Sequence, residues 1–231
     1  MGKPFILLFT PGNRRDFILK ASSYNPDGII IDLEDAVPRD LKEKVRREVG
    51  EMIPELKVRC VVRINSEPEY LEKDLNAVVS QFVDAISIPK TTLRLIRTVD
   101  GLLDQLEKER GLRPKAIKLH VSIETPYAVL KCYDLSSASE RIEVVRCSSG
   151  EEGDLQTNLK CGFAGLYYAR SKVLLDARAA GVKTVMDGVF SGIHDEEGLR
   201  KDCVLSRELG YDGRVLIHPR HIPIAREVYS S

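Results

Sequence analysis

Short aliphatic runs and amphipathic segments alternate along the whole chain. Each run is apolar at consecutive positions, as in strands buried on both faces, and we predict strands at residues 6–10, 28–32, 60–64, 85–89, 119–123, 143–147, 184–189 and 214–218. Between them, apolar residues recur every three or four positions, which predicts helices at residues 16–24, 40–53, 69–82, 91–109, 126–138, 165–180 and 196–209, with a short one from His221. The alternation predicts a parallel sheet covered by helices.

The repeat of strand and helix also predicts how the sheet closes. Eight units fill the 231 residues at about 29 residues each, and no linker or low-complexity segment interrupts them. We therefore predict one domain over residues 1–231 with an α/β fold, the (β/α)₈ or TIM barrel. It is slightly shorter than the typical size of about 250 residues.

Composition excludes several classes of protein. Lys and Arg together number 35, as do Asp and Glu, so no charge excess favours nucleic acid or an anionic membrane as a partner. No apolar run approaches the roughly 18 residues of a membrane span, and the first ten residues lack a signal-peptide cleavage region. The five cysteines form no CxxC pair, which favours reduced thiols. We predict a cytoplasmic protein.

The stretch IIIDLEDAVP, residues 29–38, indicates where the chemistry lies. An aliphatic run leads into Asp32, Glu34 and Asp35, and ionised carboxylates are expelled from a buried strand unless they are paired or bind a cation. Polar positions also follow the other runs: residues 11–14, Arg63 and Asn65, Lys90, Glu124, Glu152 and Asp154, Asp187, and His218. In a (β/α)₈ barrel the active site lies at the carboxyl ends of the strands, so we predict that these side chains share one mouth.

Two of these carboxylates suit a metal ion. Glu124 and Asp154 follow neighbouring strands and form an incomplete oxygen cage of the kind that Mg²⁺ prefers, which substrate and water would complete. Arg63 can form a paired hydrogen bond with a carboxylate or an enolate, and Lys90 could do the same or cap its loop. HExxH, GxSxG, P-loop and dinucleotide-binding motifs are absent. A metal beside an arginine predicts enolate stabilisation while a carbon–carbon bond breaks or forms.

A series of motifs, in chain order, resembles a known family. The motifs are FTPGNRRDFILKA, DGIIIDLEDAVP, VVRIN, DAISIPK, SIETP, GEEGDL and LGYDGRVLIHPRHI. They cover almost the whole chain and together resemble the citrate lyase β-subunit family of the HpcH/HpaI aldolase superfamily, which also holds malyl-CoA and citramalyl-CoA lyases. The resemblance implies a barrel of this architecture, Mg²⁺ as cofactor, an acyl-CoA thioester such as citryl-CoA or malyl-CoA as substrate, and cleavage to a 2-oxoacid and acetyl-CoA.

The resemblance implies a role for the central site residues. It makes Glu124 and Asp154 the metal ligands, and it gives Arg63 the substrate carboxyl group and the enolate charge. It lets Glu34 and Asp35 hold metal-bound water and orient Arg63, because side chains around a metal site commonly fix the groups that contact the substrate.

The remaining candidate residues lie further from this centre. Asp32, one residue deeper than Glu34, is expected to be structural, and Asp187 and His218 match family positions but could equally be structural. The family approaches the phosphate-rich CoA at the positions held here by Pro11, Gly12, Asn13, Arg14 and Lys20.

The chain departs from the family's pattern at three places. The arginine that usually precedes the first strand is replaced by Phe5, with only Lys3 nearby, so substrate anchoring differs there. The GxED pattern appears as GEEGD, so Glu152 and Asp154 compete for the metal, and Asp154 is favoured because the leucines after it keep the family's register. The chain ends about a dozen residues after the last predicted strand, so we expect no C-terminal lid.

The expected lack of a lid affects both assembly and chemistry. An uncovered mouth favours a homo-oligomer such as a trimer, in which a neighbour's loops cover the site. With no further carboxylate reaching over the substrate, nothing obvious would activate water against the thioester, so we expect reversible carbon–carbon cleavage that leaves the thioester intact.

Two other functions remain open from the sequence. The chain could be an aldolase that makes or cleaves 2-oxo-3-deoxy acids without CoA, although relatives with that activity usually place a histidine base near strand two, where this sequence has none. It could also be a barrel that binds an anionic ligand without catalysis. The sequence identifies neither the acyl group nor any further lyase subunits.

Overall fold

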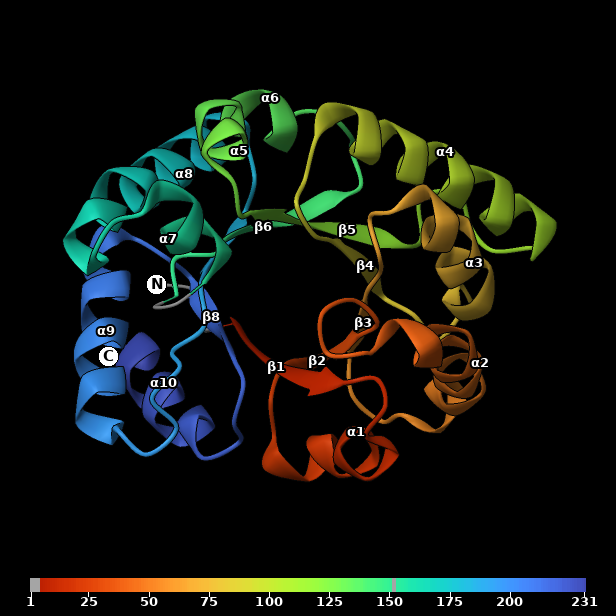
Figure 1. Cartoon of the computed structure of the whole chain (residues 1–231), viewed down its shortest axis with the longest axis horizontal. Helices are drawn as coiled ribbons and strands as arrows, with labels where there is room; N and C mark the ends of the chain where they lie inside the picture. The colour runs from red at the N-terminus through yellow and green to blue at the C-terminus, as the bar shows by residue number, and fades with distance from the viewer. Residues whose placement is uncertain (1–4, 151–152) are drawn as a thin grey trace.

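The computed structural model describes residues 5–150 and 153–231, and within them eight strands close into a barrel (Figure 1). Neighbouring strands follow chain order from β1 to β8, β8 pairs with β1, and every pair is parallel. The strands are β1 Phe5–Pro11, β2 Gly28–Asp32, β3 Cys60–Arg63, β4 Ala85–Ile88, β5 Lys118–Ile123, β6 Ile142–Cys147, β7 Thr184–Asp187 and β8 Gly213–Leu216.

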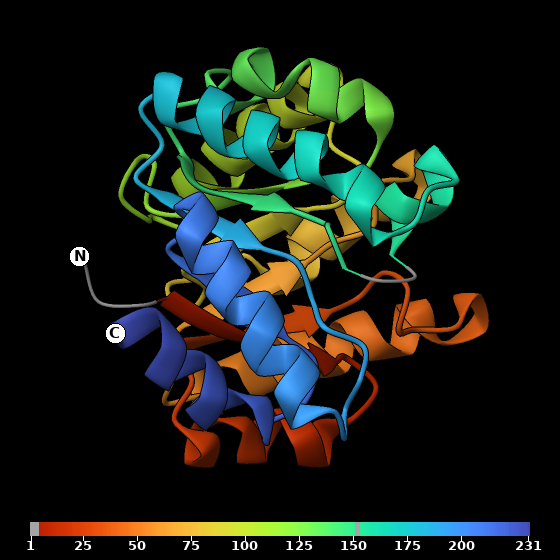
Figure 2. The same ribbon diagram turned by 90° about the vertical axis from the view of Figure 1, so that its left-hand side faces the viewer.

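The helices form a ring outside the strands (Figure 1), and Figure 2 shows the same barrel from the side. They are α1 Arg15–Ala21, α2 Lys42–Met52, α3 Pro68–Val78, α4 Leu93–Glu109, α5 Pro126–Leu130, α6 Cys132–Ser136, α7 Asp154–Leu159, α8 Tyr167–Ala179, α9 Glu196–Leu209 and α10 His221–Ser230. The predicted (β/α)₈ barrel is therefore confirmed. In the part of the chain that the structure describes, no helix combines the length and the apolar character that crossing a membrane requires.

The helix prediction is wrong at two places: one predicted helix is split, and one short helix was not predicted. The segment predicted as one helix over residues 126–138 is split at Lys131, whose backbone leaves helical geometry (φ −106°, ψ 15°). Both halves bury residues toward the barrel, so the apolar spacing gives no sign of a one-residue break. The loop predicted after strand six contains α7, which has one buried residue, Leu155, and is too short to show a helical period.

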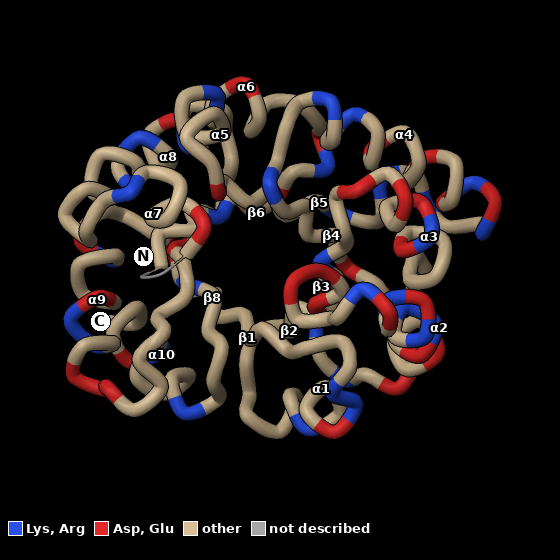
Figure 3. Tube along the Cα trace, viewed as in Figure 1, with Lys and Arg blue, Asp and Glu red and all other residues tan. Residues whose placement is uncertain are grey.

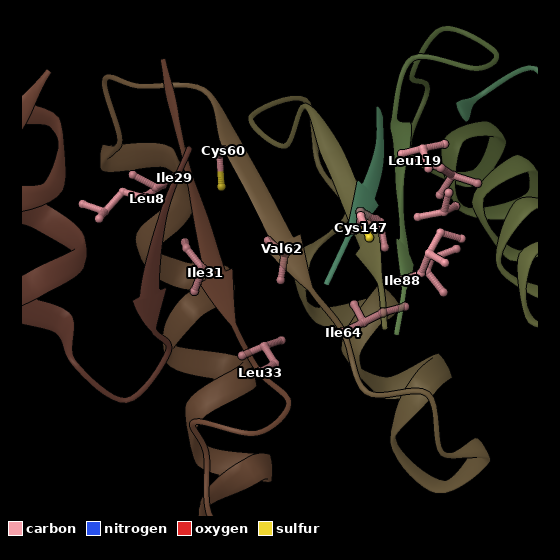
Figure 4. Packing of buried hydrophobic residues seen from close by; sticks show 14 of the residues in the cluster. Leu8, Ile29, Ile31, Leu33, Cys60, Val62, Ile64, Ile88, Leu119 and Cys147 are labelled. Carbon is pink, nitrogen blue, oxygen red and sulfur yellow. The ribbon is translucent and has the colours of Figure 1, made fainter. Parts of the chain in front are cut away.

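Alternation along the strands divides the apolar core into two layers. Outward-facing residues pack against the helices, and Figure 4 shows this layer with Ile31, Val62 and Ile88 among its members. Inward-facing residues form a smaller cluster inside the barrel: Leu7, Ile30, Val61, Ala85, Val144, Met186 and Val215. The period of two therefore explains why both faces of each strand are apolar.

Inward positions turn polar toward the carboxyl ends of the strands. Two residues beyond Ile30, Val61 and Val144 on the same strand faces lie Asp32, Arg63 and Arg146. Pairing between strands sets these side chains next to one another: Asp32 is in register with Arg63, and Arg146 is in register with Ser122. The barrel thus has an apolar floor and a charged upper layer.

Candidate active site

A cavity of about 350 Å³ opens at the carboxyl ends of the strands. Among the described residues, four carboxylates and two guanidinium groups line it: Asp32, Asp35, Glu124, Asp154, Arg63 and Arg146. Figure 3 shows the acidic turn after β2 lying at the centre of the barrel. The mouth predicted from the strand ends is therefore present, and it carries more negative than positive charge.

Arg63 is held by three carboxylates. Its Nε and Nη2 donate to the two oxygens of Asp32, at 2.8 and 2.7 Å. Its Nη1 lies 2.9 Å from Glu34 Oε2 and 3.3 Å from Asp35 Oδ2. Burial disfavours the charged form of Arg63, but the hydrogen bonds and charge of Asp32 outweigh it and raise the pKa of the guanidinium. Every nitrogen of this side chain is thus engaged.

Asp32, which we expected from the sequence to be structural, is the main partner of Arg63. Besides the paired bond, its carboxylate accepts the backbone N–H groups of Glu34 and Ala36, at 2.9 and 3.0 Å, which shapes the turn after β2. Burial opposes its ionisation, yet the hydrogen bonds and charge of Arg63 hold its pKa below the usual value. The pairing follows from the register of β2 and β3, which sets Asp32 next to Arg63.

Glu34 lies behind Arg63 in a buried position. Its Oε1 accepts a hydrogen bond from Lys90 Nζ at 2.9 Å, and its side chain is 4% exposed. Burial raises its pKa to about 7, although the charge of Arg63 and the bond from Lys90 oppose this shift. Asp35, by contrast, is exposed at the cavity edge. Glu34 and Asp35 both lie against Arg63, so the geometry is compatible with their predicted orienting role.

Glu124 is fixed from three sides at the end of β5. Its Oε1 accepts hydrogen bonds from Arg146 Nη2 at 3.0 Å and Ser148 Oγ at 3.1 Å, and its Oε2 accepts the backbone N–H of Lys90 at 2.7 Å. Lys90, which donates this N–H, adopts a left-handed backbone conformation (φ 45°). Lys90 therefore contacts Glu124 through its backbone and Glu34 through its side chain.

Asp154 lies at the start of α7 and faces the cavity that Glu124 also lines. The structure thus brings the two predicted metal ligands to the same cavity. Glu152, which competes with Asp154 for this role in the sequence, and Lys3, the only base near Phe5, both lie outside the described residues.

The donor set fits a divalent cation that is only partly held by protein. Glu124 and Asp154 line the cavity with two carboxylates, and substrate and water would complete the oxygen shell that Mg²⁺ prefers. The excess of carboxylates in the cavity favours a cation. In addition, Glu34 Oε2 is buried and lacks a well-aligned hydrogen bond, although Arg63 Nη1 lies 2.9 Å away.

The residues predicted to approach CoA do not all reach a cavity. Pro11 lines both the mouth and an adjoining cavity of about 340 Å³, which Lys20 and His218 also line. Asn13 is exposed, and Arg14 is turned toward Asp16, with two donors at 3.2 Å from its carboxylate.

Gly12, another of these positions, packs tightly against β2. Its N–H donates to the Asp32 carbonyl at 2.9 Å, and a Cβ there would lie 2.6 Å from the same oxygen. A glycine at this place therefore lets the first loop approach the second strand.

Asp187 is structural in this arrangement. It is fully buried and paired with Arg170, and it accepts hydrogen bonds from Ser149 Oγ and from the backbone N–H of Gly188. Burial opposes its ionisation, but the charge of Arg170 holds its pKa below the usual value.

Arg146, which also lines the mouth cavity, was not among the predicted site residues. The signal available in the sequence was an arginine inside the apolar strand EVVRC.

Comparisons with known proteins agree with this architecture. The profile of the HpcH/HpaI aldolase/citrate lyase family matches residues 6–219. The citrate lyase subunit beta of Leuconostoc mesenteroides subsp. cremoris is 32% identical over 230 residues, which cover 97% of this chain and 76% of that protein. A (3S)-malyl-CoA thioesterase of Cereibacter sphaeroides is 32% identical over 228 residues, with the same coverage of each chain.

Solved structures show the same fold. The citrate lyase beta subunit of Mycobacterium tuberculosis, complexed with oxaloacetate and magnesium, superposes with a TM-score of 0.79 at 25% identity and covers 100% of this chain and 98% of its own. RipC from Yersinia pestis gives a TM-score of 0.80 at 20% identity over 99% of this chain and 96% of its own, a likeness of fold. With the family profile spanning nearly all of the barrel, this chain belongs to the HpcH/HpaI aldolase/citrate lyase family.

Proposed function

We propose that the chain is a Mg²⁺-dependent carbon–carbon lyase that acts on a 3-hydroxyacyl-CoA thioester. The products would be a 2-oxoacid and an acyl-CoA, with the thioester intact. The observation that carries the proposal is the shared cavity of Glu124, Asp154 and Arg63, where negative charge is in excess. The M. tuberculosis relative, whose structure holds magnesium and oxaloacetate, supports the same chemistry.

Glu124 and Asp154 would hold the metal. Glu124 is suited to this because Ser148 Oγ and the Lys90 N–H already fix the orientation of its carboxylate. When bound, Mg²⁺ would act as a Lewis acid toward the oxygen at the carbon that becomes the 2-oxo group.

Arg63 would act on the substrate directly. Its guanidinium is held in place by the paired bond to Asp32, so it needs no reorganisation when charge develops on the acyl oxygen as the carbon–carbon bond breaks. Its longest contact, 3.3 Å to the exposed Asp35, is the one that a substrate oxygen can most easily replace. Asp35 would thereby move aside while Asp32 keeps Arg63 in position.

Product analysis tests this proposal. The purified chain is incubated with Mg²⁺ and, in turn, citryl-, malyl- and citramalyl-CoA, and the products are identified by mass spectrometry. We expect a 2-oxoacid and acetyl-CoA from one of the three. Free CoA with an intact hydroxyacid would show a thioesterase, and full activity after dialysis against EDTA would exclude the metal-dependent mechanism.

A further inference from the structure

Arg146 is a buried guanidinium at the bottom of the candidate active site. It comes from β6, lines the mouth cavity, and is only 6% exposed. Its Nη2 donates to Ser122 Oγ at 2.6 Å and to Glu124 Oε1 at 3.0 Å. These two bonds use both N–H groups of Nη2 and fix the direction of the guanidinium.

The remaining two nitrogens of Arg146 are open to a ligand. Within residues 5–150 and 153–231, no acceptor takes a hydrogen bond from its Nε or Nη1. Neither atom is among the fully enclosed polar atoms without a partner, so both reach the cavity. Arg63, the other guanidinium of the mouth, differs because three carboxylates engage all of its nitrogens.

Both guanidiniums lie against the same aromatic ring. The Cζ atoms of Arg63 and Arg146 are 4.9 and 5.0 Å from the centroid of Phe9. Both side chains also line the mouth cavity, where one ligand can contact both. The Nε–H and Nη1–H groups of Arg146 point to different sides of the guanidinium, because the Nε–Cδ bond lies between them. Nη1 carries two N–H groups on a cation, so a carboxylate oxygen is a suitable acceptor for it.

We propose that Arg146 is a specificity-determining residue that binds a second carboxylate on the oxoacid part of the substrate. This inference rests on the proposed function, in which Arg63 and the metal site take the carboxyl and oxo groups common to all 2-oxoacids. Arg146 then favours a dicarboxylic 2-oxoacid over a monocarboxylic one. A monocarboxylic oxoacid leaves Nη1 of Arg146 without a charged acceptor, which disfavours its binding.

Oxaloacetate and pyruvate form a matched pair for the test, because they differ by one carboxylate. Their dissociation constants are measured by calorimetric titration in the cold with Mg²⁺ present, using freshly dissolved oxaloacetate. We expect the unmodified chain to bind oxaloacetate about ten-fold or more tightly than pyruvate. Arg146→Gln should remove this preference and leave pyruvate binding within about three-fold. Arg146→Lys, which keeps the charge but loses the planar guanidinium, should lie between the two.

Arg97→Gln, an exposed change on α4, is the control and should bind both oxoacids like the unmodified chain. Equal affinities for the two oxoacids in the unmodified chain, or an equal loss of both in Arg146→Gln, would overturn the proposal while leaving the lyase function standing. If the unmodified chain bound neither oxoacid with Mg²⁺, the lyase function itself would fail. If Arg146→Gln did not fold, Arg146→Lys would decide the question through the ratio of its two dissociation constants.

Discussion

Two buried arginines at opposite ends of β6 have different surroundings. Arg141, just before the strand, is completely buried and uses every nitrogen: Nε donates to Asp100, Nη1 to Glu107 and the Ile117 carbonyl, and Nη2 to Asp104 and Glu107. Arg146, near the end of the strand, donates through Nη2 alone among the described residues.

The difference follows from where each arginine lies in the barrel. Arg141 connects β6 to α4 and the loop before β5, far from the mouth, so full pairing there contributes to stability. Arg146 lies at the carboxyl end, where a (β/α)₈ barrel binds its ligands. The same buried cation thus acts as a structural clamp at one end and keeps donors open to a cavity at the other.

The largest expected effect concerns the carboxylate beside Arg146. Glu124→Gln keeps the shape of the side chain but removes a charge that the metal requires, so kcat/KM should fall by roughly a thousand-fold. Steady-state kinetics with the thioester identified by product analysis measure the loss. The matching change at the other end, Glu107→Gln, should leave kcat/KM of the folded protein unchanged. Comparable kinetic losses in the two variants would remove the functional difference between the ends of the barrel.

Loss of the ion pairs of Arg141 should reduce the free energy of unfolding more than loss of Arg146. Arg141→Met leaves a buried Glu107 without its cation, so the free energy of unfolding should fall by about 3 kcal/mol. Arg146→Met should cost about 1 to 2 kcal/mol, because Glu124 keeps two other donors and faces the cavity. Urea unfolding of the two variants gives both values. A larger loss in Arg146→Met would show that Arg146 is also mainly structural.

The next largest loss of activity is expected from a change at Arg63. Arg63→Lys keeps the charge but cannot form the paired bond with Asp32 or present a planar group to the substrate, so kcat/KM should fall by roughly a hundred-fold. Initial-rate kinetics provide the measurement. A loss no greater than that of Lys90→Met would mean that the reacting centre has been placed on the wrong strands.

The ion pairs between Arg141 and its carboxylates should also make the stability of the protein fall at acid pH. Burial opposes ionisation of Asp100 and Glu107, but hydrogen bonds from Arg141 and its neighbours hold the pKa of each below its usual value. This stabilisation is complete above the unfolded pKa values of about 4 and is lost as pH falls through the lower, folded values. The stability gap between the unmodified chain and Arg141→Met should therefore narrow at acid pH, which urea unfolding between about pH 7 and pH 3 measures. A stability difference that did not change with pH would contradict the pairing of Asp100 and Glu107 with Arg141.

Lys90→Met should have the smallest effect on activity. Its side chain reaches Glu34 and is about half exposed, whereas its backbone N–H, which the substitution keeps, fixes Glu124. We expect kcat/KM to fall by about ten-fold or less, as for the loss of one supporting contact to a site. Initial-rate kinetics beside Arg63→Lys would test this, and a larger loss than in Arg63→Lys would assign Lys90 the main role.

The sequence by itself determined the barrel and the position of its mouth. Apolar runs at strand length, helical spacing between them and polar residues at the strand ends are local patterns, and each was readable without neighbours. For the same reason Arg63, Glu124 and Asp154 could be named as one site, since parallel strands bring their carboxyl ends together. The short α7 and the break at Lys131 were not predicted, because neither leaves a periodic pattern in the sequence.

Only the tertiary structure decided which charges pair and which face the cavity. Asp32 and Arg63 meet because β2 and β3 align in register, and Arg146 meets Glu124 across β5 and β6. Such pairings depend on strand register and side-chain direction, which residues 31 and 22 positions apart in the chain do not encode locally. The open Nε and Nη1 donors of Arg146 are a property of three-dimensional packing, because none of the described residues places an acceptor beside them.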